Sequence, residues 1–364
     1  MVSDHADPPR RLIVTDVSLR NYRSYAQLEL ELEPGVVLVT GANGAGKTNL
    51  LEALHVATQG FSPRTRSDGQ LIRFGESGAR VGLRGRRGDV AVELELVLRA
   101  GAGKQGRLNG AALRSTEELR AEVATLVFTP DRLAVVKGGP SVRRAYFDRA
   151  LGRLFPARGG LPGEYGETLA QRNAALRRAA LGVSSREAVE PWTERVAELG
   201  AALAEARRAV LAELGLAAAE AADALSLPEL RLEYRGDEVS AAALRERLDR
   251  DLERGTTGLG PHLDDVAVLA GTRDLRLYGS QGEQRLAVLA LLLGEASSVA
   301  ERRGAPPLLL LDDVLSELDP ERRRALAQLL RGAGQTLVTA TDASFLPDVP
   351  DLLVLVTPGA AARA

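Results

Sequence analysis

Eight consecutive residues, 41–48, read Gly-Ala-Asn-Gly-Ala-Gly-Lys-Thr and match the phosphate-binding pattern GxxxxGK followed by Ser or Thr. An apolar run, Val36–Thr40, precedes them and predicts a strand, whereas 48–57 predict a helix. Glycines in such a turn let backbone N–H groups curl around an anion at the positive end of the helix. Only three residues of the chain are lysines, so a chance match is rare. The sequence therefore predicts a loop that holds a triphosphate.

Two side chains of this P-loop have predicted roles of their own. We expect Lys47 to reach the β and γ oxygens of ATP as a point charge. We expect Thr48 to offer its hydroxyl to Mg²⁺, a cation that keeps most of its waters and accepts few protein ligands. The predicted cofactors are therefore ATP and Mg²⁺.

Far along the chain, the apolar run Leu308–Leu311 predicts a buried parallel strand that ends in two carboxylates. We assign Asp312 to the Mg²⁺ shell and Asp313 to the catalytic base that orients or deprotonates the attacking water. Aspartates are also common at strand ends and in turns, so the pair alone decides little. The spacing Asp-Asp-x-x-Ser-x-x-Asp, which ends at Asp319, resembles the Walker B motif and D-loop of ABC-type ATPases and favours the functional interpretation.

Composition narrows the class of protein. The chain has 364 residues, 45% of them hydrophobic, which suffices for one large or two ordinary domains without covalent cross-links. The absence of cysteine excludes disulfides and thiolate metal sites, and the histidines His5, His55 and His262 lack the spacing of a metal centre. No apolar stretch approaches twenty residues and no signal-peptide pattern is present, so we expect a cytoplasmic protein without a membrane partner.

Charge gives no sign of a nucleic-acid partner by itself, because the formal net charge is −2. Arginine accounts for 44 of the 47 basic residues, a bias that a GC-rich genome explains, although guanidinium also binds phosphate well. A solvated helix face is the commoner meaning of a basic run. The candidate DNA-contacting clusters are Arg84 with Arg86 and Arg87, Arg143 with Arg144, and Arg322 with Arg323 and Arg324.

Residue periodicity predicts a head with two kinds of strand. Apolar and polar residues alternate over 12–40 and predict half-exposed strands that lead to the P-loop. After a glycine- and arginine-rich stretch, 60–88, alternation resumes in Asp89–Leu98, and an Asn-Gly turn interrupts Arg107–Leu113. These segments predict an antiparallel meander, followed by a strand at Ala124–Phe128.

Between 141 and 255 the composition shifts to Ala, Leu, Arg and Glu at helical spacing, clearest in 192–224. We expect a helical lobe here, with the ATPase head formed by 1–140 and 256–364. Four prolines divide the lobe into separate helices: Pro156, Pro162, Pro191 and Pro228. Within the second part of the head we expect strands at Val266–Ala270, Asp274–Tyr278, Leu308–Leu311, Thr336–Thr339 and Leu352–Val356, and a helix from about Gln281.

The order of these segments resembles the ATPase heads shared by ABC transporters, SMC proteins and RecF. In such heads a signature loop at a helix N-terminus grips the γ-phosphate bound to the other protomer. The corresponding residues here are Ser280, Gln281, Gly282, Glu283 and Gln284. Gln281 and Glu283 depart from the transporter form Leu-Ser-Gly-Gly-Gln. The His expected after the last core strand is also missing, which leaves Thr339, Thr341 and Asp342 as candidates for its place.

Short blocks over nearly the whole chain resemble the RecF family. They include Asn21-Tyr-Arg-Ser-Tyr25, Gly41–Ala53, Arg64-Thr-Arg66, Leu71–Gly75, Phe128-Thr-Pro-Asp131, Val136-Lys-Gly138, Arg143-Arg144, Gly260-Pro-His262 with Asp264-Asp265, and Gly279–Arg285. The resemblance implies that Arg23, Arg64 and Arg66 lie near the nucleotide and that the Asp131 loop senses Mg²⁺. It also implies a nucleotide cradle of Gly41, Asn43, Gly44, Ala45, Gly46, Lys47, Thr48 and Asn49.

Length separates the relatives, because Lys47 and Ser280 are 233 positions apart (280 minus 47). SMC proteins insert hundreds of heptad residues in this interval, and a transporter ATPase would be shorter there. The predicted fold class is therefore α/β, an ABC-type P-loop ATPase head with a mixed sheet, an antiparallel meander and a helical lobe, without a long coiled coil.

Membership of the RecF family implies a weak ATPase that works as a switch: two protomers sandwich two ATP molecules, and hydrolysis lets this ATP-dependent homodimer part. The family role is to bind double-stranded, gapped or junction DNA without sequence preference and, with RecR and RecO, to help load RecA in recombinational repair, DNA replication and the SOS response. An ATP-gated scaffold that binds only proteins is the alternative. A P-loop kinase is a weaker one, because the sequence suggests no acceptor pocket.

Overall fold

The structure, a computed structural model, describes residues 12–115 and 117–364, so the predictions that concern His5 fall outside it. Contacts divide the chain into two compact units. The sheet unit comprises the described residues up to 132 together with 224–226 and 295–364, and the helical unit comprises 133–223 and 227–294. This division differs from the predicted boundaries, because 133–140 and 256–294 group with the helical unit.

The central sheet of the sheet unit has the order β15-β14-β3-β13-β12-β8. Its strands are β15 (Ala360–Arg363), β14 (Leu352–Thr357), β3 (Val36–Thr40), β13 (Thr336–Ala340), β12 (Leu308–Leu311) and β8 (Thr125–Phe128). All neighbours pair in parallel except β14 and β15. Every residue of β3, β8, β12 and β13 is buried, as parallel strands covered on both faces require. The P-loop and the Asp312-Asp313 pair follow β3 and β12, so both lie at the carboxyl edge of this sheet.

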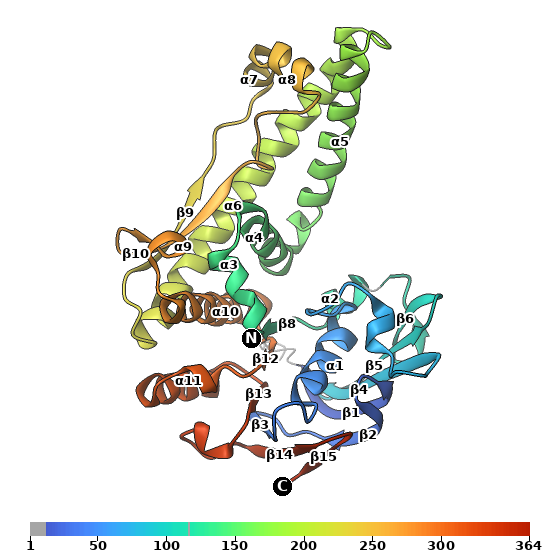
Figure 1. Cartoon of the computed structure of the whole chain (residues 1–364), viewed down its shortest axis with the longest axis vertical. Coiled ribbons are helices and arrows are strands. Elements are labelled where there is room, and N and C mark those ends of the chain that lie inside the picture. The colour runs from blue at the N-terminus through green and yellow to red at the C-terminus, as the bar shows by residue number, and fades with distance from the viewer. Residues whose placement is uncertain (1–11, 116) are drawn as a thin grey trace, which may run out of the picture. The chain divides into compact units, whose positions relative to one another are not determined.

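A second, antiparallel sheet in the same unit confirms the predicted meander. Its order is β2-β1-β4-β5-β6-β7, formed by β2 (Tyr25–Glu31), β1 (Leu12–Tyr22), β4 (Gly78–Arg87), β5 (Val90–Arg99), β6 (Gly103–Leu108) and β7 (Ala111–Ala112). The P-loop helix α1 (Lys47–Gln59) packs against β4 and β5, and its apolar residues share one core with both sheets (Figure 1). The unit also contains α2 (Glu117–Glu122) and α11 (Pro320–Gly332).

Strand β4 was missed by the sequence prediction, which described 60–88 as a glycine- and arginine-rich stretch and assigned no strand there. The glycines are in the strand because β1 approaches it closely. A Cβ atom at Gly82 would lie 2.4 Å from Ser18 Oγ, and one at Gly85 would lie 2.2 Å from the carbonyl oxygen of Ile13. The register between β1 and β4 also shifts at Val14, which marks a bulge beside this contact.

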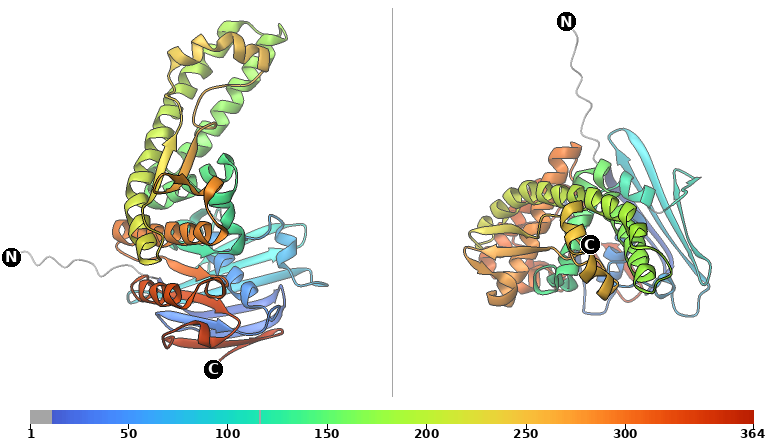
Figure 2. Two further views of the ribbon diagram at one scale, coloured as in Figure 1. Left: turned by 60° about the vertical axis from the view of Figure 1, so that its left-hand side comes forward. Right: turned by 90° about the horizontal axis from the view of Figure 1, so that it is seen from above.

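The helices of the helical unit differ widely in length. They are α3 (Ala134–Lys137), α4 (Pro140–Leu154), α5 (Leu161–Ala180), α6 (Glu190–Ala224), α7 (Ala241–Glu246), α8 (Leu248–Arg254), α9 (Leu275–Tyr278) and the first part of α10 (Gln281–Arg303). Figures 1 and 2 show α5 and α6 side by side as an antiparallel pair. Pro162 and Pro191 lie in the first turns of these helices, where a missing N–H costs no helical hydrogen bond. None of the described helices is long and apolar enough to span a bilayer.

Two segments of the helical unit differ from the prediction. The lobe was expected to be wholly helical, but β9 (Leu230–Arg235) pairs along its length with β10 (Asp265–Ala270), and β10 pairs in turn with β11 (Arg273–Asp274). This pairing explains why residues after 255 belong to the helical unit. The strand predicted at Asp274–Tyr278 is instead the short helix α9, because the Asp274 side chain caps it by accepting the Arg276 N–H at 3.0 Å.

Candidate functional site

The glycines of the P-loop have backbone conformations that other residues rarely adopt. Gly41, Gly44 and Gly46 have φ angles of 154°, 79° and 119°. A Cβ atom at Gly41 would lie 2.2 Å from the carbonyl oxygen of Val356, and one at Gly46 would lie 3.0 Å from the Tyr25 hydroxyl oxygen. The first turn of α1 contains no acidic residue, so its positive end faces the loop unopposed. This cradle, which side chains would fill, fits a polyphosphate.

Lys47 is 8% exposed, and its side chain spans the loop. Its Nζ donates to the carbonyl oxygens of Gly41 at 2.6 Å and Ala42 at 3.0 Å. Burial lowers the pKa of Lys47, and the carboxylates of Asp313 and Asp312 oppose that shift. The predicted phosphate-binding lysine and the two aspartates are thus within electrostatic range of one another.

Asp312 and Thr48 meet at the carboxyl edge of the central sheet. The Oδ1 atom of Asp312 accepts hydrogen bonds from Thr48 Oγ1 at 3.0 Å and from Thr339 Oγ1 at 2.8 Å. Burial raises the pKa of Asp312, whereas the bonds from Thr339 and Thr48 oppose the shift. A hydroxyl and a buried carboxylate that converge in this way fit Mg²⁺, which prefers oxygen ligands and needs few from the protein.

Asp313 has a different environment from its neighbour. Its φ of 51° is left-handed, which is rare for a residue with a side chain. Its N–H donates to Thr339 Oγ1 at 2.8 Å, and its Oδ1 is buried without a hydrogen-bond partner among the described residues. Thr339 therefore contacts both aspartates, which distinguishes it from the other candidates that the sequence offered for the missing His. In the sequence, its position near the place of the missing His and its polarity within the buried strand β13 both pointed to it.

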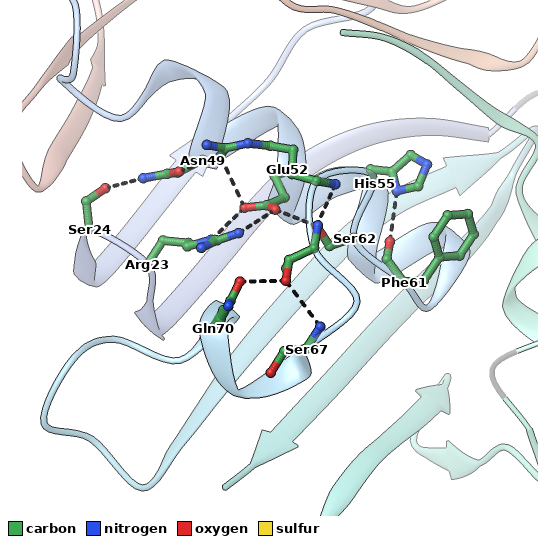
Figure 3. Close-up of polar contacts among 11 residues, drawn as sticks. Arg23, Ser24, Asn49, Glu52, His55, Phe61, Ser62, Ser67 and Gln70 are labelled. Atoms are coloured by element: carbon green, nitrogen blue, oxygen red, sulfur yellow. Dashed lines mark hydrogen bonds and ion pairs between the residues drawn. The ribbon is translucent and has the colours of Figure 1, made fainter. Parts of the chain in front are cut away.

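The arginines predicted near the nucleotide lie on two loops, one after β1 and one after α1, and Figure 3 shows Arg23 of the first loop beside Glu52. Arg23 follows β1 and forms a bidentate ion pair with Glu52 of α1, with both N–O distances at 2.8 Å. Arg64 Nη1 donates to Asn49 Oδ1 at 3.2 Å. Asn49 Nδ2 in turn donates to Ser24 Oγ at 3.0 Å. Sequence reasoning named Arg23, Arg64 and Asn49 but missed Glu52, to which both arginine loops connect.

Two further predicted residues of the sheet unit are exposed. Arg66 lies on the same loop as Arg64, and Asp131 lies on a 3-10 turn, Pro130–Leu133, directly after β8. Because β8 pairs in parallel with β12, the Asp131 turn begins at the same sheet edge as Asp312. The roles proposed for Arg66 in nucleotide binding and for Asp131 in Mg²⁺ binding stay predictions.

The signature-like loop lies at the N-terminus of α10, which begins at Gln281 as predicted. Ser280 and Glu283 form a capping box: the Glu283 side chain accepts the Ser280 N–H at 2.8 Å, and Ser280 Oγ accepts the Glu283 N–H at 3.2 Å. Arg273 donates to Glu283 at 2.7 Å, and Gln284 Nε2 donates to the carbonyl oxygen of Leu275 at 2.8 Å. The departure at Glu283 therefore has a structural role, because it orders the loop that presents Ser280.

His262 and members of the basic clusters have partners within the protein. Arg143 is buried and binds Asp265 through two bonds of 2.7 Å. His262 contacts Tyr165 at 2.7 Å and the carbonyl oxygen of Thr257 at 3.0 Å, and the described residues contain no cluster of three or more His, Cys, Asp or Glu side chains that could hold a metal ion. Ion pairs also join Arg84 to Glu93 and Arg322 to Asp319. His262 is therefore held in place by Tyr165 and by the backbone at Thr257.

The comparisons with known proteins decide the family. Residues 13–361 match the family model described as RecF/RecN/SMC N terminal domain. The chain is also 38% identical to the DNA replication and repair protein RecF of Myxococcus xanthus, over 90% of each chain. The chain belongs to the RecF family. It is 34% identical to the RecF protein of Heliobacterium modesticaldum, over 89% of this chain and 91% of that protein.

Solved structures give the same assignment. A structure described as the recombination mediator protein RecF-ATP in the RecFOR pathway matches with a TM-score of 0.87 and 29% identity, over 99% of this chain and 100% of that one. The Smc head domain of Pyrococcus furiosus matches with a TM-score of 0.60 at 15% identity, which is a likeness of fold alone. The predicted fold class, an ABC- and SMC-type ATPase head in the RecF family, is thereby confirmed.

Proposed function

We propose that this RecF-family protein is an ATP-gated DNA clamp of recombinational repair. The observation that carries the proposal is the convergence of the P-loop, Thr48, Asp312 and Asp313 at one sheet edge. The ATP-bound state named for the similar RecF structure supports the choice of nucleotide. The pathway named there, RecFOR, supports RecR and RecO as partners. We also propose a cytoplasmic location and RecA loading at gaps and ds/ss junctions as the outcome.

In this proposal the residues of the site have separate roles in slow ATP hydrolysis. Lys47 and the backbone amides of the P-loop would bind the phosphates, and Thr48 and Asp312 would hold Mg²⁺, which would neutralise phosphate charge. Asp313 is the group that orients or deprotonates the attacking water. The Ser280 loop of a second protomer completes the site in trans. Nucleotide state thereby controls dimerisation, and dimerisation controls DNA binding.

A protein-only scaffold is the second candidate, and the charge distribution favours it. The net charge is −2, and at least one member of each basic cluster singled out in the sequence has an acidic partner. Non-specific DNA binding depends on phosphate contacts with available cations. An ATP switch that engages only RecR and RecO would need no such cations.

Binding of a labelled gapped duplex by fluorescence anisotropy, with and without Mg-ATP, separates the two candidates. We expect the wild type to bind DNA roughly tenfold more tightly with Mg-ATP, and Lys47→Ala to lose this enhancement. The matched control is Lys104→Ala, which removes a partly buried lysine paired with Asp68 and should behave as the wild type. DNA binding in no nucleotide state, with RecR binding retained, would replace the clamp by the scaffold.

A further inference from the structure

A single buried carboxylate connects the two arginine loops beside the P-loop. Glu52 lies one helical turn after Thr48 on α1, and its side chain is 1% exposed. It receives both bonds from Arg23, and its Oε1 also accepts a hydrogen bond from Ser62 Oγ at 2.6 Å (Figure 3). Burying a carboxylate is costly unless it is paired, so this cluster holds the charge by several charge-assisted bonds.

Ser62 connects Glu52 to the loop that carries Arg64. While its hydroxyl donates to Glu52, its oxygen accepts the backbone N–H groups of Arg64 at 3.0 Å and Thr65 at 3.1 Å. The start of the loop that carries Arg64 is thereby tied to α1. The Arg64 guanidinium itself lies 3.6 Å from Glu52, a longer and weaker contact than the pair made by Arg23.

The charges of this cluster do not balance. Two guanidinium groups face one carboxylate, so one positive charge remains for an anionic ligand. Arg64 is the more accessible of the two, with 38% of its side chain exposed against 20% for Arg23. Arg64 also donates to the side chain of Asn49, the residue that directly follows Thr48 on α1. The excess charge therefore lies beside the end of the P-loop.

We propose that Glu52 and Ser62 are positioning residues that preset Arg23 and Arg64 for the terminal phosphates of the nucleotide, with Ser62 acting through Arg64. This inference rests on the proposed ATP site and adds two residues to it. Fixing a long side chain before the ligand arrives removes an ordering cost from binding. Loss of either residue then weakens the contact of the arginines with phosphate without removing any group that touches the ligand.

A double-mutant cycle between Ser62→Ala and Arg64→Ala tests the relay, with affinities for Mg-ATP and Mg-ADP measured by calorimetry. Arg64→Ala removes a charge-assisted contact and should weaken Mg-ATP binding by roughly tenfold, and Mg-ADP binding by less. Ser62→Ala should reproduce part of the ATP effect. The double variant should bind no more weakly than Arg64→Ala alone, because the two residues act as one unit.

Additive losses, or equal losses for ATP and ADP in Ser62→Ala, would overturn the relay and leave Ser62 a structural residue. Glu52→Gln should weaken Mg-ATP more than Ser62→Ala, because it releases both arginines. Asp348→Asn breaks an exposed arginine–aspartate pair with Arg331 in the same unit and should leave affinity unchanged. Thermal melting of each ligand-free variant shows whether it is folded. If Glu52→Gln is misfolded, the cycle between Ser62→Ala and Arg64→Ala decides the proposal. A wild type that binds no Mg-ATP would instead refute the proposed function itself.

Discussion

Asp312 and Asp313 are adjacent in sequence, yet the structure gives them opposite surroundings. Asp312 is buried and accepts bonds from two threonines, whereas Asp313 has a strained backbone and a buried oxygen without a partner among the described residues. Carboxylates whose environments differ in this way commonly take different roles in one reaction. A strained backbone conformation persists only when contacts around it hold it in place. Here the Asp313 N–H donates to the Thr339 hydroxyl, which holds the backbone of Asp313.

The raised pKa of Asp312 predicts that this residue destabilises the ligand-free protein. A carboxyl group whose pKa is higher in the folded state contributes stability below its ordinary pKa and loses that contribution as pH rises through the folded value. At pH 7 the ionised form is therefore unfavourable. Asp312→Asn keeps an oxygen for Thr48 and Thr339, so the melting temperature should rise by roughly 1–3 °C.

Calorimetry of wild type and Asp312→Asn at pH 7 and at mildly acidic pH checks this. The difference should shrink as pH falls, because the wild-type carboxyl becomes protonated. Mg-ATP should raise the melting temperature of the wild type more than that of the variant, since only the wild type holds the cation with a carboxylate. A lower melting temperature for ligand-free Asp312→Asn would contradict an unfavourable charge on Asp312 in the ligand-free protein.

The residues of short motifs could be predicted from the sequence because their spacing is local. The side chains that they contact in the folded protein could not. Lys47, Thr48, Asp312 and Asp313 follow from short patterns beside apolar runs. Glu52 pairs with Arg23 across 29 positions, and it meets Ser62 only because the chain returns to α1 after that helix ends. Such contacts depend on the packing of β1 and α1, which no local pattern in one sequence contains.

At the scale of elements, the N-terminus of α10 shows how a side chain sets the shape of a loop. Bonds from Arg273 and from the Ser280 N–H lower the pKa of Glu283 to about 2. The stability that this carboxylate contributes is therefore present above its ordinary pKa and is lost as pH falls from about 4.5 toward 2. At neutral pH the capping box is fully formed, so the loop that carries Ser280 is ordered before any partner arrives.

Removal of the box should loosen this loop. Glu283→Ala leaves the Ser280 N–H unpaired, and we expect amides of 280–284 to exchange with solvent about fivefold faster at pH 7. Glu283→Gln is the matched control, because Gln also closes a capping box and should retain most of the protection. Hydrogen exchange followed by mass spectrometry measures both. Equal exchange in wild type and Glu283→Ala would show that packing of α10, and not the cap, orders the loop.

The same scale shows which elements sequence can predict. Buried parallel strands such as β3 and β12 are continuous apolar runs and were placed correctly. Strand β4 was missed because its glycines serve a close approach by β1, and glycine in isolation indicates a loop. The segment of α9 was predicted as a strand, and in the sequence Leu275 and Leu277 alternate with polar residues. In the structure the Asp274 side chain caps the first turn, which favours a helix.

At the scale of the whole molecule, the proposed clamp requires that Ser280 complete a nucleotide site in another protomer. The P-loop belongs to the sheet unit and Ser280 to the helical unit. A site built from two protomers makes the ATPase activity depend on assembly, and it lets ATP binding hold the dimer closed. This arrangement predicts complementation between two defective proteins, because their defects fall on different halves of a shared site.

Lys47→Ala should not bind ATP, and Ser280→Arg should bind ATP but not dimerise with itself, because the long side chain occupies the place of the γ-phosphate. In a mixed dimer one site combines both defects, while the other joins the intact P-loop of Ser280→Arg to the intact loop of Lys47→Ala. Mixing the two inactive proteins should therefore restore part of the wild-type ATPase activity, measured as phosphate release at saturating Mg-ATP. A mixture of Glu283→Ala with Lys47→Ala controls for the loss of the capping box, because alanine at 283 removes the box without adding a bulky side chain to the loop. A mixture as inactive as its components, with Ser280→Arg binding ATP weakly by itself, would show that Ser280 acts within its own protomer.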